Sequence, residues 1–257
     1  MSSIIIKNKL AIDRMRTAGY LLADVIEEIR DSVIVGATTR QIDATIEKSM
    51  LCKGLKAECK GYGGYKFATC ISLNDIIVHG VPSQEVVLKN GDFVKIDVVG
   101  SYKGYCADMT RFFFVGNVSD QVKRIANTAQ NALNLGIEII QPGVKLSAVS
   151  ARIQHHVEQA GYAVVRDFAG HGIGRCMHEE PDVPNYEKDD CDVILREGMT
   201  LAIEPMIAEY GFQVTILEDG WTAKTADGGL AAHVEDTIVV TRDGVEILTR
   251  KSVDGQK

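Results

Sequence analysis

Residues 92–115 read DFVKIDVVGSYKGYCADMTRFFFV, two strand-like runs on either side of a turn. Both runs are rich in β-branched and aromatic residues, and the segment GSYKG at 100–104 separates them. This pattern predicts neighbouring antiparallel strands over 92–100 and 104–115. Each run nevertheless carries an aspartate among apolar neighbours, Asp97 in the first and Asp108 at the start of the second. These two acids are the first indication of a functional site.

Helical and strand-like segments continue on both sides of this predicted hairpin. Before it, apolar residues between Ile12 and Ile26 recur at spacings of three and four, which places them on one face of a helix. Thr38 or Thr39 can cap a second helix that reaches Met50, and a strand-like segment covers 68–79. After the hairpin, helices are predicted over 119–140 and 146–159, then strands at 162–166, 199–206, 220–224 and 233–241. The order of helices and then strands thus occurs twice. We predict an α/β (α+β) fold, one domain over residues 1–257 with an internal pseudo-repeat.

Composition and charge limit the functions that the chain can have. Its 257 residues are 46% hydrophobic and 25% charged, typical of a soluble globular protein. The net charge of -7 opposes a general role in binding nucleic acids or anionic membranes, which requires basic patches. No apolar run is long enough for a signal-peptide core or a membrane span. We therefore expect a cytoplasmic protein.

The cysteines indicate reduced thiols. None forms a CxxC pair or has zinc-finger spacing, and the chain has no export signal. The six are Cys52, Cys59, Cys70, Cys106, Cys176 and Cys191.

Four carboxylates lie where a buried strand would be apolar. They are Asp97, Asp108, Glu204 and Glu235. An ionised carboxylate in such surroundings is costly unless it is paired, hydrogen-bonded or bound to a cation. One such acid alone would be explained as a surface residue or half of a salt bridge. The only basic residues close by in sequence, Lys95 and Arg111, are too few for four acids.

Histidines beside glycines complete a predicted metal site. His171 stands between Gly170 and Gly172, which favours an extended segment or loop and allows close approach of a metal. Four carboxylates and one imidazole suit two divalent cations such as manganese, iron or cobalt, better than a structural zinc. Two such ions can share a bridging hydroxide and clamp a carbonyl as it becomes tetrahedral. The expected chemistry is metal-assisted hydrolysis.

Several strings resemble the methionine aminopeptidases over about residues 7–250. They are HGVP, KIDVVGSYKGYCADMTRFFFVG, FAGHGIGRCMHEEP, GMTLAIEPM and VEDTIVV, and their five ligands agree with those of the family in type and order. The resemblance implies the pita-bread fold, with two pseudo-symmetric halves of antiparallel strands backed by helices. The chain resembles the bacterial-style type 1 enzymes, because it has neither a long zinc-binding extension nor the helical insertion of type 2.

The resemblance also implies a role for each site residue. Asp97 would bind one metal with both carboxylate oxygens, Asp108 and Glu235 would bridge two ions, and His171 and Glu204 would complete the second. Glu204 would also shuttle the proton, while His79 and His178 would contact the substrate beside the scissile bond. The methionine pocket would be lined by Cys59, Tyr62, Tyr65, Cys70 and Trp221.

The implied activity is removal of the N-terminal methionine from nascent proteins and peptides, with a small second residue preferred. The activity would require two divalent metal ions. These would be manganese, iron or cobalt, with zinc and nickel as alternatives. The implied partners are nascent chain N-termini, with contact to the ribosome left open, and the protein would be a monomer. The alternatives are an Xaa-Pro-type aminopeptidase of the same fold and a non-catalytic binding homologue.

Two departures from the family pattern adjoin Glu235. Family members commonly have Gln two residues before this glutamate and His directly after it, where this chain has His233 and Asp236. Residues around a ligand orient it and tune the metal. We therefore expect Asp236→His to change metal affinity or rate.

Overall fold

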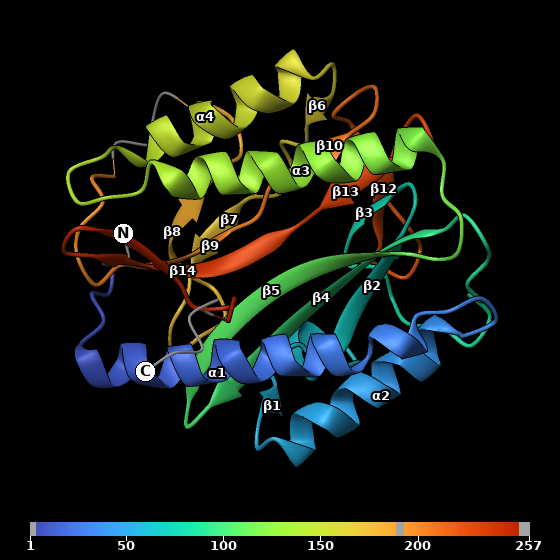
Figure 1. Ribbon diagram of the computed structural model, residues 1–257, viewed down its shortest axis with the longest axis horizontal. Coiled ribbons are helices and arrows are strands. Elements are labelled where there is room, and N and C mark those ends of the chain that lie inside the picture. Colours follow the sequence, from blue (N-terminus) through green and yellow to red (C-terminus); the bar gives the residue numbers. More distant parts are fainter. Residues whose placement is uncertain (1–3, 189–192, 252–257) are drawn as a thin grey trace.

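The computed structural model describes residues 4–188 and 193–251, with strands between two pairs of helices (Figure 1). The helices are α1 (Lys9–Glu28), α2 (Thr39–Cys52), α3 (Asp120–Glu138) and α4 (Leu146–Gln159), with 3-10 turns η1 (Arg30–Ser32) and η2 (Tyr62–Gly64). The strands are β1 (Lys56–Ala57), β2 (Thr69–Leu73), β3 (Ile76–Val78), β4 (Phe93–Tyr102), β5 (Tyr105–Phe114), β6 (Ala163–Val164), β7 (Gly170–Gly172), β8 (Glu179–Val183), β9 (Thr200–Ile203), β10 (Met206–Ala208), β11 (Val214–Ile216), β12 (Ala223–Thr225), β13 (Ala231–His233), β14 (Glu235–Thr241) and β15 (Gly244–Ile247).

The predicted hairpin is confirmed as β4 and β5. The two strands pair antiparallel along their whole length, from Phe93 opposite Phe114 to Tyr102 opposite Tyr105. Lys103 and Gly104 make the turn with φ of 50° and 76°. Positive φ at both central residues is typical of the tight turn whose twist matches that of the flanking strands. This rigid hairpin fixes where Asp97 and Asp108 point.

One nine-stranded sheet joins the two halves of the chain. Its order is β1-β4-β5-β14-β9-β7-β8, with β2 added on β4 and β15 on β14, and every strand pair is antiparallel among the described residues. Two smaller sheets, β13-β10-β6 and β11-β12-β3, complete the fold. Within the large sheet the halves meet where β5 pairs with β14.

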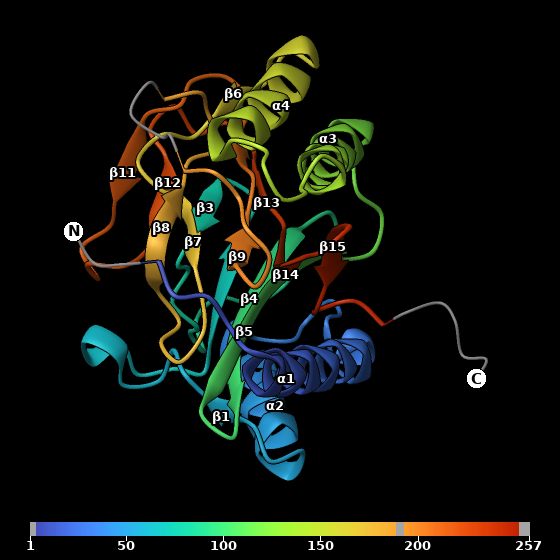
Figure 2. The same cartoon turned by 90° about the vertical axis from the view of Figure 1, so that its left-hand side faces the viewer.

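Each half has its own pair of helices on its strands (Figures 1 and 2). α1 packs on β4 and β5, and its buried face includes Met15, Leu22 and Val25, as the spacing predicted. α2 begins with a capping box between Thr38 and Gln41. α3 and α4 pack on each other and on strands of the second half. This confirms the predicted α/β architecture with two halves of antiparallel strands backed by helices, and the shared sheet favours the single domain, which stays a prediction.

Several predicted strands are divided in the structure. The segment 68–79 is broken after β2 at Asn74, where φ is 47°, and 199–206 is broken at Glu204-Pro205. Proline cannot donate a hydrogen bond to the sheet, so β9 ends there and the chain moves to a smaller sheet as β10. Likewise 233–241 is divided at Val234 into β13 and β14. Both Glu204 and Glu235 therefore lie where the chain changes sheets.

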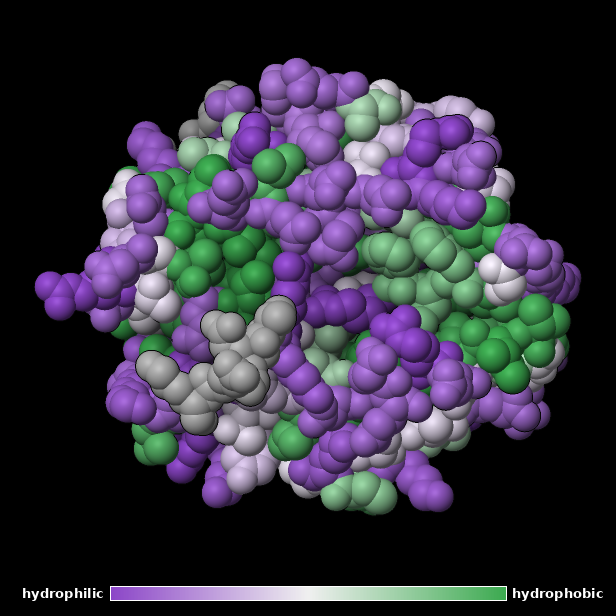
Figure 3. All heavy atoms as spheres, in the orientation of Figure 1, coloured by the Kyte–Doolittle hydropathy of each residue, from purple (hydrophilic) through white to green (hydrophobic). Residues whose placement is uncertain are grey.

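Hydrophilic side chains predominate on the face in Figure 3. The five described cysteines are free thiols as predicted, and Cys191 lies outside the described residues. Among residues 4–188 and 193–251, no helix is both long and apolar enough to cross a bilayer.

Candidate active site

A cavity of about 770 Å³ opens between the two halves of the sheet. Its volume lies within the range of small-molecule sites. Every site residue predicted from the sequence lines it. These are Cys59, Tyr62, Tyr65, Cys70, His79, Asp97, Asp108, His171, His178, Glu204, Trp221 and Glu235.

Strand alternation brings three of the acids to one face of the large sheet. Asp97 on β4 is opposite Thr110 on β5, and Asp108 lies two residues from Thr110, so both aspartates share a face. Glu235 on β14 is opposite Thr110 from the other side, and the Thr110 hydroxyl donates to its Oε2 at 3.1 Å. The eleven-residue spacing between the aspartates thus has a direct structural cause.

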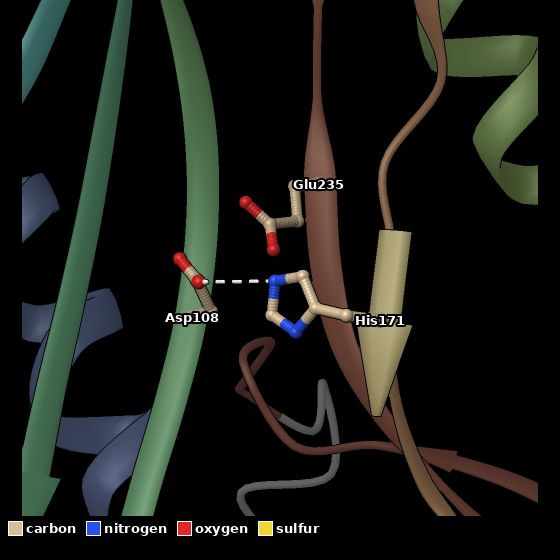
Figure 4. Close-up of side chains that lie close together, drawn as sticks. All are labelled: Asp108, His171 and Glu235. Atoms are coloured by element: carbon tan, nitrogen blue, oxygen red, sulfur yellow. Dashed lines mark ion pairs between the residues drawn. The ribbon is translucent and has the colours of Figure 1, made fainter. Parts of the chain in front are cut away.

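The second half of the chain supplies His171 and Glu204. His171 is on β7, opposite Ala202 of β9, in the extended segment that its flanking glycines predicted. Gly172 is required there, because a Cβ would lie 2.1 Å from the Glu180 carbonyl oxygen. Glu204 follows β9 directly, and the Asn185 amide donates to its backbone carbonyl at 2.9 Å. Figure 4 shows His171 and Glu235 facing Asp108 from separate strands.

Three of these acids have a buried oxygen without a hydrogen-bond partner in the described part of the chain. Buried oxygens of Asp97 (Oδ1), Asp108 (Oδ1) and Glu235 (Oε1) have no hydrogen bond among the described residues. Lys95 points elsewhere, donating to the Asn74 and Ala231 carbonyls at 3.0 Å each. Buried polar atoms without partners are rare and costly. We call Asp97, Asp108, Glu204 and Glu235 the acid cluster, and its free oxygens fit divalent cations.

Two sets of possible metal ligands share Glu235. One set is Asp108, His171 and Glu235, and the other is Glu204, His233 and Glu235, each with its ligand atoms within 4.8 Å of one another. His171 Nδ1–H donates to the Gly172 carbonyl at 2.9 Å, which leaves Nε2 free to act as a ligand. That Nε2 atom lies 3.8 Å from Asp108 Oδ2 and 3.4 Å from Glu204 Oε1. These separations bring the ligand atoms close enough to share a metal ion.

The electrostatics agree with bound cations. Burial first, and then repulsion by neighbouring acids, raises the pKa of Asp108, Glu204 and Glu235. A divalent ion would reverse this effect by favouring the ionised carboxylates. Burial lowers the pKa of His171 and His233 to about 4, so both imidazoles are neutral, the form that binds metal.

His79 and His178 stand beside the acid cluster. His79 follows β3 with φ of 59°, a rare backbone conformation for a residue other than glycine, and its ring meets Phe168 edge to face. The His178 ring lies 4.4 Å from that of His171, and Tyr62 OH is 3.0 Å from its Nδ1. Both imidazoles line the cavity and are available to a substrate there.

The predicted methionine pocket is largely apolar. Cys59, Tyr65, Cys70 and Trp221 pack in one hydrophobic cluster, and the Tyr65 and Trp221 rings meet edge to face at 5.1 Å. A hydrogen bond with Cys70, and then burial, raises the pKa of the Cys59 thiol well above its usual value. It therefore stays protonated and presents an uncharged sulfur. Tyr62, 49% exposed, lies at the rim.

Sequence reasoning did not assign His233 to the site, although it lines the cavity. Its position two residues before Glu235 was the available signal, because alternate residues of a strand face the same side.

Asp236 points away from the cavity. It accepts hydrogen bonds from Arg111 Nη2 at 2.6 Å, Thr249 Oγ1 at 2.7 Å and Arg250 Nε at 2.7 Å, and it is fully buried. Arg111 also donates to the backbone carbonyl of Glu235 at 2.6 Å. Asp236 is therefore linked to Glu235 through the backbone and Arg111, and, besides burial, its charge also contributes to raising the pKa of Glu235.

Known proteins are similar to this chain in sequence and in fold. Residues 13–242 match metallopeptidase family M24. Methionine aminopeptidase A of Synechocystis sp. is 41% identical over 247 residues, 96% of this chain and 98% of that protein. The crystal structure of methionine aminopeptidase from Thermotoga maritima has a TM-score of 0.94 and 42% identity, over 97% of this chain and all of that one. A Xaa-Pro dipeptidase from Bacillus anthracis has a TM-score of 0.76 and 28% identity, and this chain covers 62% of it.

Proposed function

This chain belongs to metallopeptidase family M24, and from that premise we propose that it is a methionine aminopeptidase that removes the N-terminal methionine from nascent proteins and peptides. The observation that carries the proposal is one cavity in which an acid cluster with unpartnered buried oxygens adjoins an apolar pocket with thiol and aromatic walls. The pita-bread architecture of the relatives supports it as well.

The acid cluster and His171 would hold two divalent ions. Asp97 would help to hold one ion and His171 with Glu204 the other, while Asp108 and Glu235 would serve both. Carboxylate-rich sites suit manganese, iron or cobalt, and zinc or nickel are alternatives. Bound ions would polarise the scissile carbonyl and activate water.

The protein's own groups would bind the peptide and move the proton. His79 would contact the substrate near its N-terminal amine and scissile nitrogen, and His178 the carbonyl oxygen beside the scissile bond. Glu204 would accept a proton from the attacking water and deliver it to the departing nitrogen.

The pocket walls favour a methionine side chain. Thioethers make favourable contacts with aromatic rings and other sulfurs, which Tyr65, Trp221 and the two thiols supply. Tyr62 would close the rim beside His178. We expect the substrate to have a small second residue, and we expect the N-termini of nascent chains to be the partners. Contact with the ribosome is left open. We also expect a monomeric protein with a cytoplasmic location.

The two alternatives are less well supported. The Xaa-Pro dipeptidase from Bacillus anthracis is considerably longer than this chain. A non-catalytic homologue would have no use for unpaired buried acids. Hydrolysis of Met-Ala-Ser, set against Ala-Pro peptides, tests the choice with apo-protein titrated with manganese, iron, cobalt and zinc. We expect methionine release, and none under any metal would overturn the proposal.

A further inference from the structure

His233 is a buried imidazole with no partner for one nitrogen. It is the last residue of β13, opposite Met206 of β10, and only 2% of its surface is exposed. Its Nε2 atom has no hydrogen bond among the described residues. That nitrogen points at the acid cluster, 3.4 Å from Glu204 Oε2. A buried nitrogen in such a position requires an explanation, because groups of this kind are normally satisfied.

Two imidazoles approach Glu204 in the same way. His171 Nε2 lies 3.4 Å from Oε1, and His233 Nε2 lies 3.4 Å from Oε2. Neither contact is among the hydrogen bonds of the two histidines. Ligands that share an ion, each about 2.0 to 2.2 Å from it, lie roughly 3.0 to 3.4 Å apart. Both separations therefore fit ligands on shared ions.

We propose that His233 is a further metal ligand, binding through Nε2 to the ion held by Glu204 and Glu235. The inference rests on the metal centre of the proposed function and adds one protein ligand to the five given there. Glu204, His233 and Glu235 bring their ligand atoms within 4.8 Å of one another, as do Asp108, His171 and Glu235. The ion that His171 and Glu204 would hold thereby gains a second imidazole, and Glu235 is common to both ligand sets.

The alternative is that His233 only positions Glu204 by a hydrogen bond. His233→Gln separates the two roles, because glutamine can still donate a hydrogen bond to a carboxylate but is a poor substitute for an imidazole ligand. A second imidazole also affects which metal the site prefers. Imidazole favours cobalt, nickel and zinc, whereas manganese prefers oxygen ligands. His233 should therefore shift the metal preference of the site toward cobalt, nickel and zinc.

The test uses the full chain stripped of metal and titrated calorimetrically with cobalt and with manganese. We expect His233→Gln to lower cobalt affinity by about tenfold or more, with a smaller loss for manganese. His79→Gln is the matched control. It removes an imidazole from the same cavity that belongs to neither ligand set, so cobalt affinity should be unchanged.

Proton NMR of the cobalt-loaded protein is a second readout. Each histidine ligand gives a strongly shifted, solvent-exchangeable ring N–H signal. We expect one signal for His171 and one for His233, and the latter should vanish in His233→Gln. A single such signal in the wild type, with unchanged cobalt affinity in the variant, would overturn the inference. Failure of the wild type to bind any metal would instead contradict the proposed function.

Discussion

Replacement of Asp236 by asparagine should destabilise the protein although it leaves the cavity lining intact. The carboxylate is fully buried and joins Arg111, Thr249 and Arg250. An amide can accept from one arginine, but its NH₂ group then faces the other as donor to donor. Removing one partner of a buried ion pair costs about 3–5 kcal/mol. Because the arginine side chains are 23% and 36% exposed and can be hydrated, we take the lower limit, about 3 kcal/mol.

Calorimetry measures this loss as a lower melting temperature. For a chain of this size, about 3 kcal/mol corresponds to roughly 6 to 12 °C. Asp13→Asn is the matched control, because Asp13 also pairs with two cations, Lys9 and Arg16, but its side chain is 41% exposed. We expect no measurable change there. Equal melting temperatures for Asp236→Asn and wild type would refute the reasoning. Asp236→His removes the same charge, and its effect on metal affinity or rate stays a prediction from the sequence.

Three substitutions test the site itself. Glu204→Gln should lower methionine release by about a hundredfold or more in peptide kinetics, because the proton shuttle is lost. Retained activity in a folded variant would exclude that role. Trp221→Leu should lower kcat/KM for methionine peptides roughly two- to tenfold through lost sulfur–aromatic contact, with exposed Tyr210→Leu unchanged as control. Gly172→Ala should lower both the melting temperature and cobalt affinity, since the added Cβ meets the Glu180 carbonyl and displaces β7. Normal metal titration of that variant would contradict this account.

The sequence predicted the hairpin and the site because both depend on local pattern. Side-chain alternation along β4 and β5, joined by a two-residue turn, puts Asp97 and Asp108 on one face of the sheet. This result does not depend on how the rest of the chain folds. Glycines on both sides of His171 similarly indicated the extended backbone that β7 has. The residues that family resemblance assigned to the site all line one cavity. Their individual roles remain predictions.

The strand breaks could not be predicted, because they depend on pairing between distant segments. β9 and β10 belong to different sheets, as do β13 and β14, yet each pair reads as one apolar run. The partners of Asp236 were hidden for the same reason. Strand alternation alone turns Asp236 away from Glu235, but its partner Arg111 is over a hundred residues away in sequence, on β5, and only the paired strands bring the two together.

The pairing of β5 with β14 explains why two acids, Glu235 and Asp236, follow each other in the sequence. Within the large sheet the halves meet at β5 and β14, through Glu235 opposite Thr110 and Asp236 opposite Met109. Successive residues of a strand point to opposite faces. On the cavity side, Glu235 belongs to both possible ligand sets, so cations there would draw Asp108 of the first half toward His171 and Glu204 of the second. On the other side, Asp236 joins Arg111 of the first half to Arg250 of the second. Electrostatic interactions would thus connect the two halves on both faces of this junction. A neutral residue at 236 would remove those on the far face and leave mainly the interactions on the cavity face.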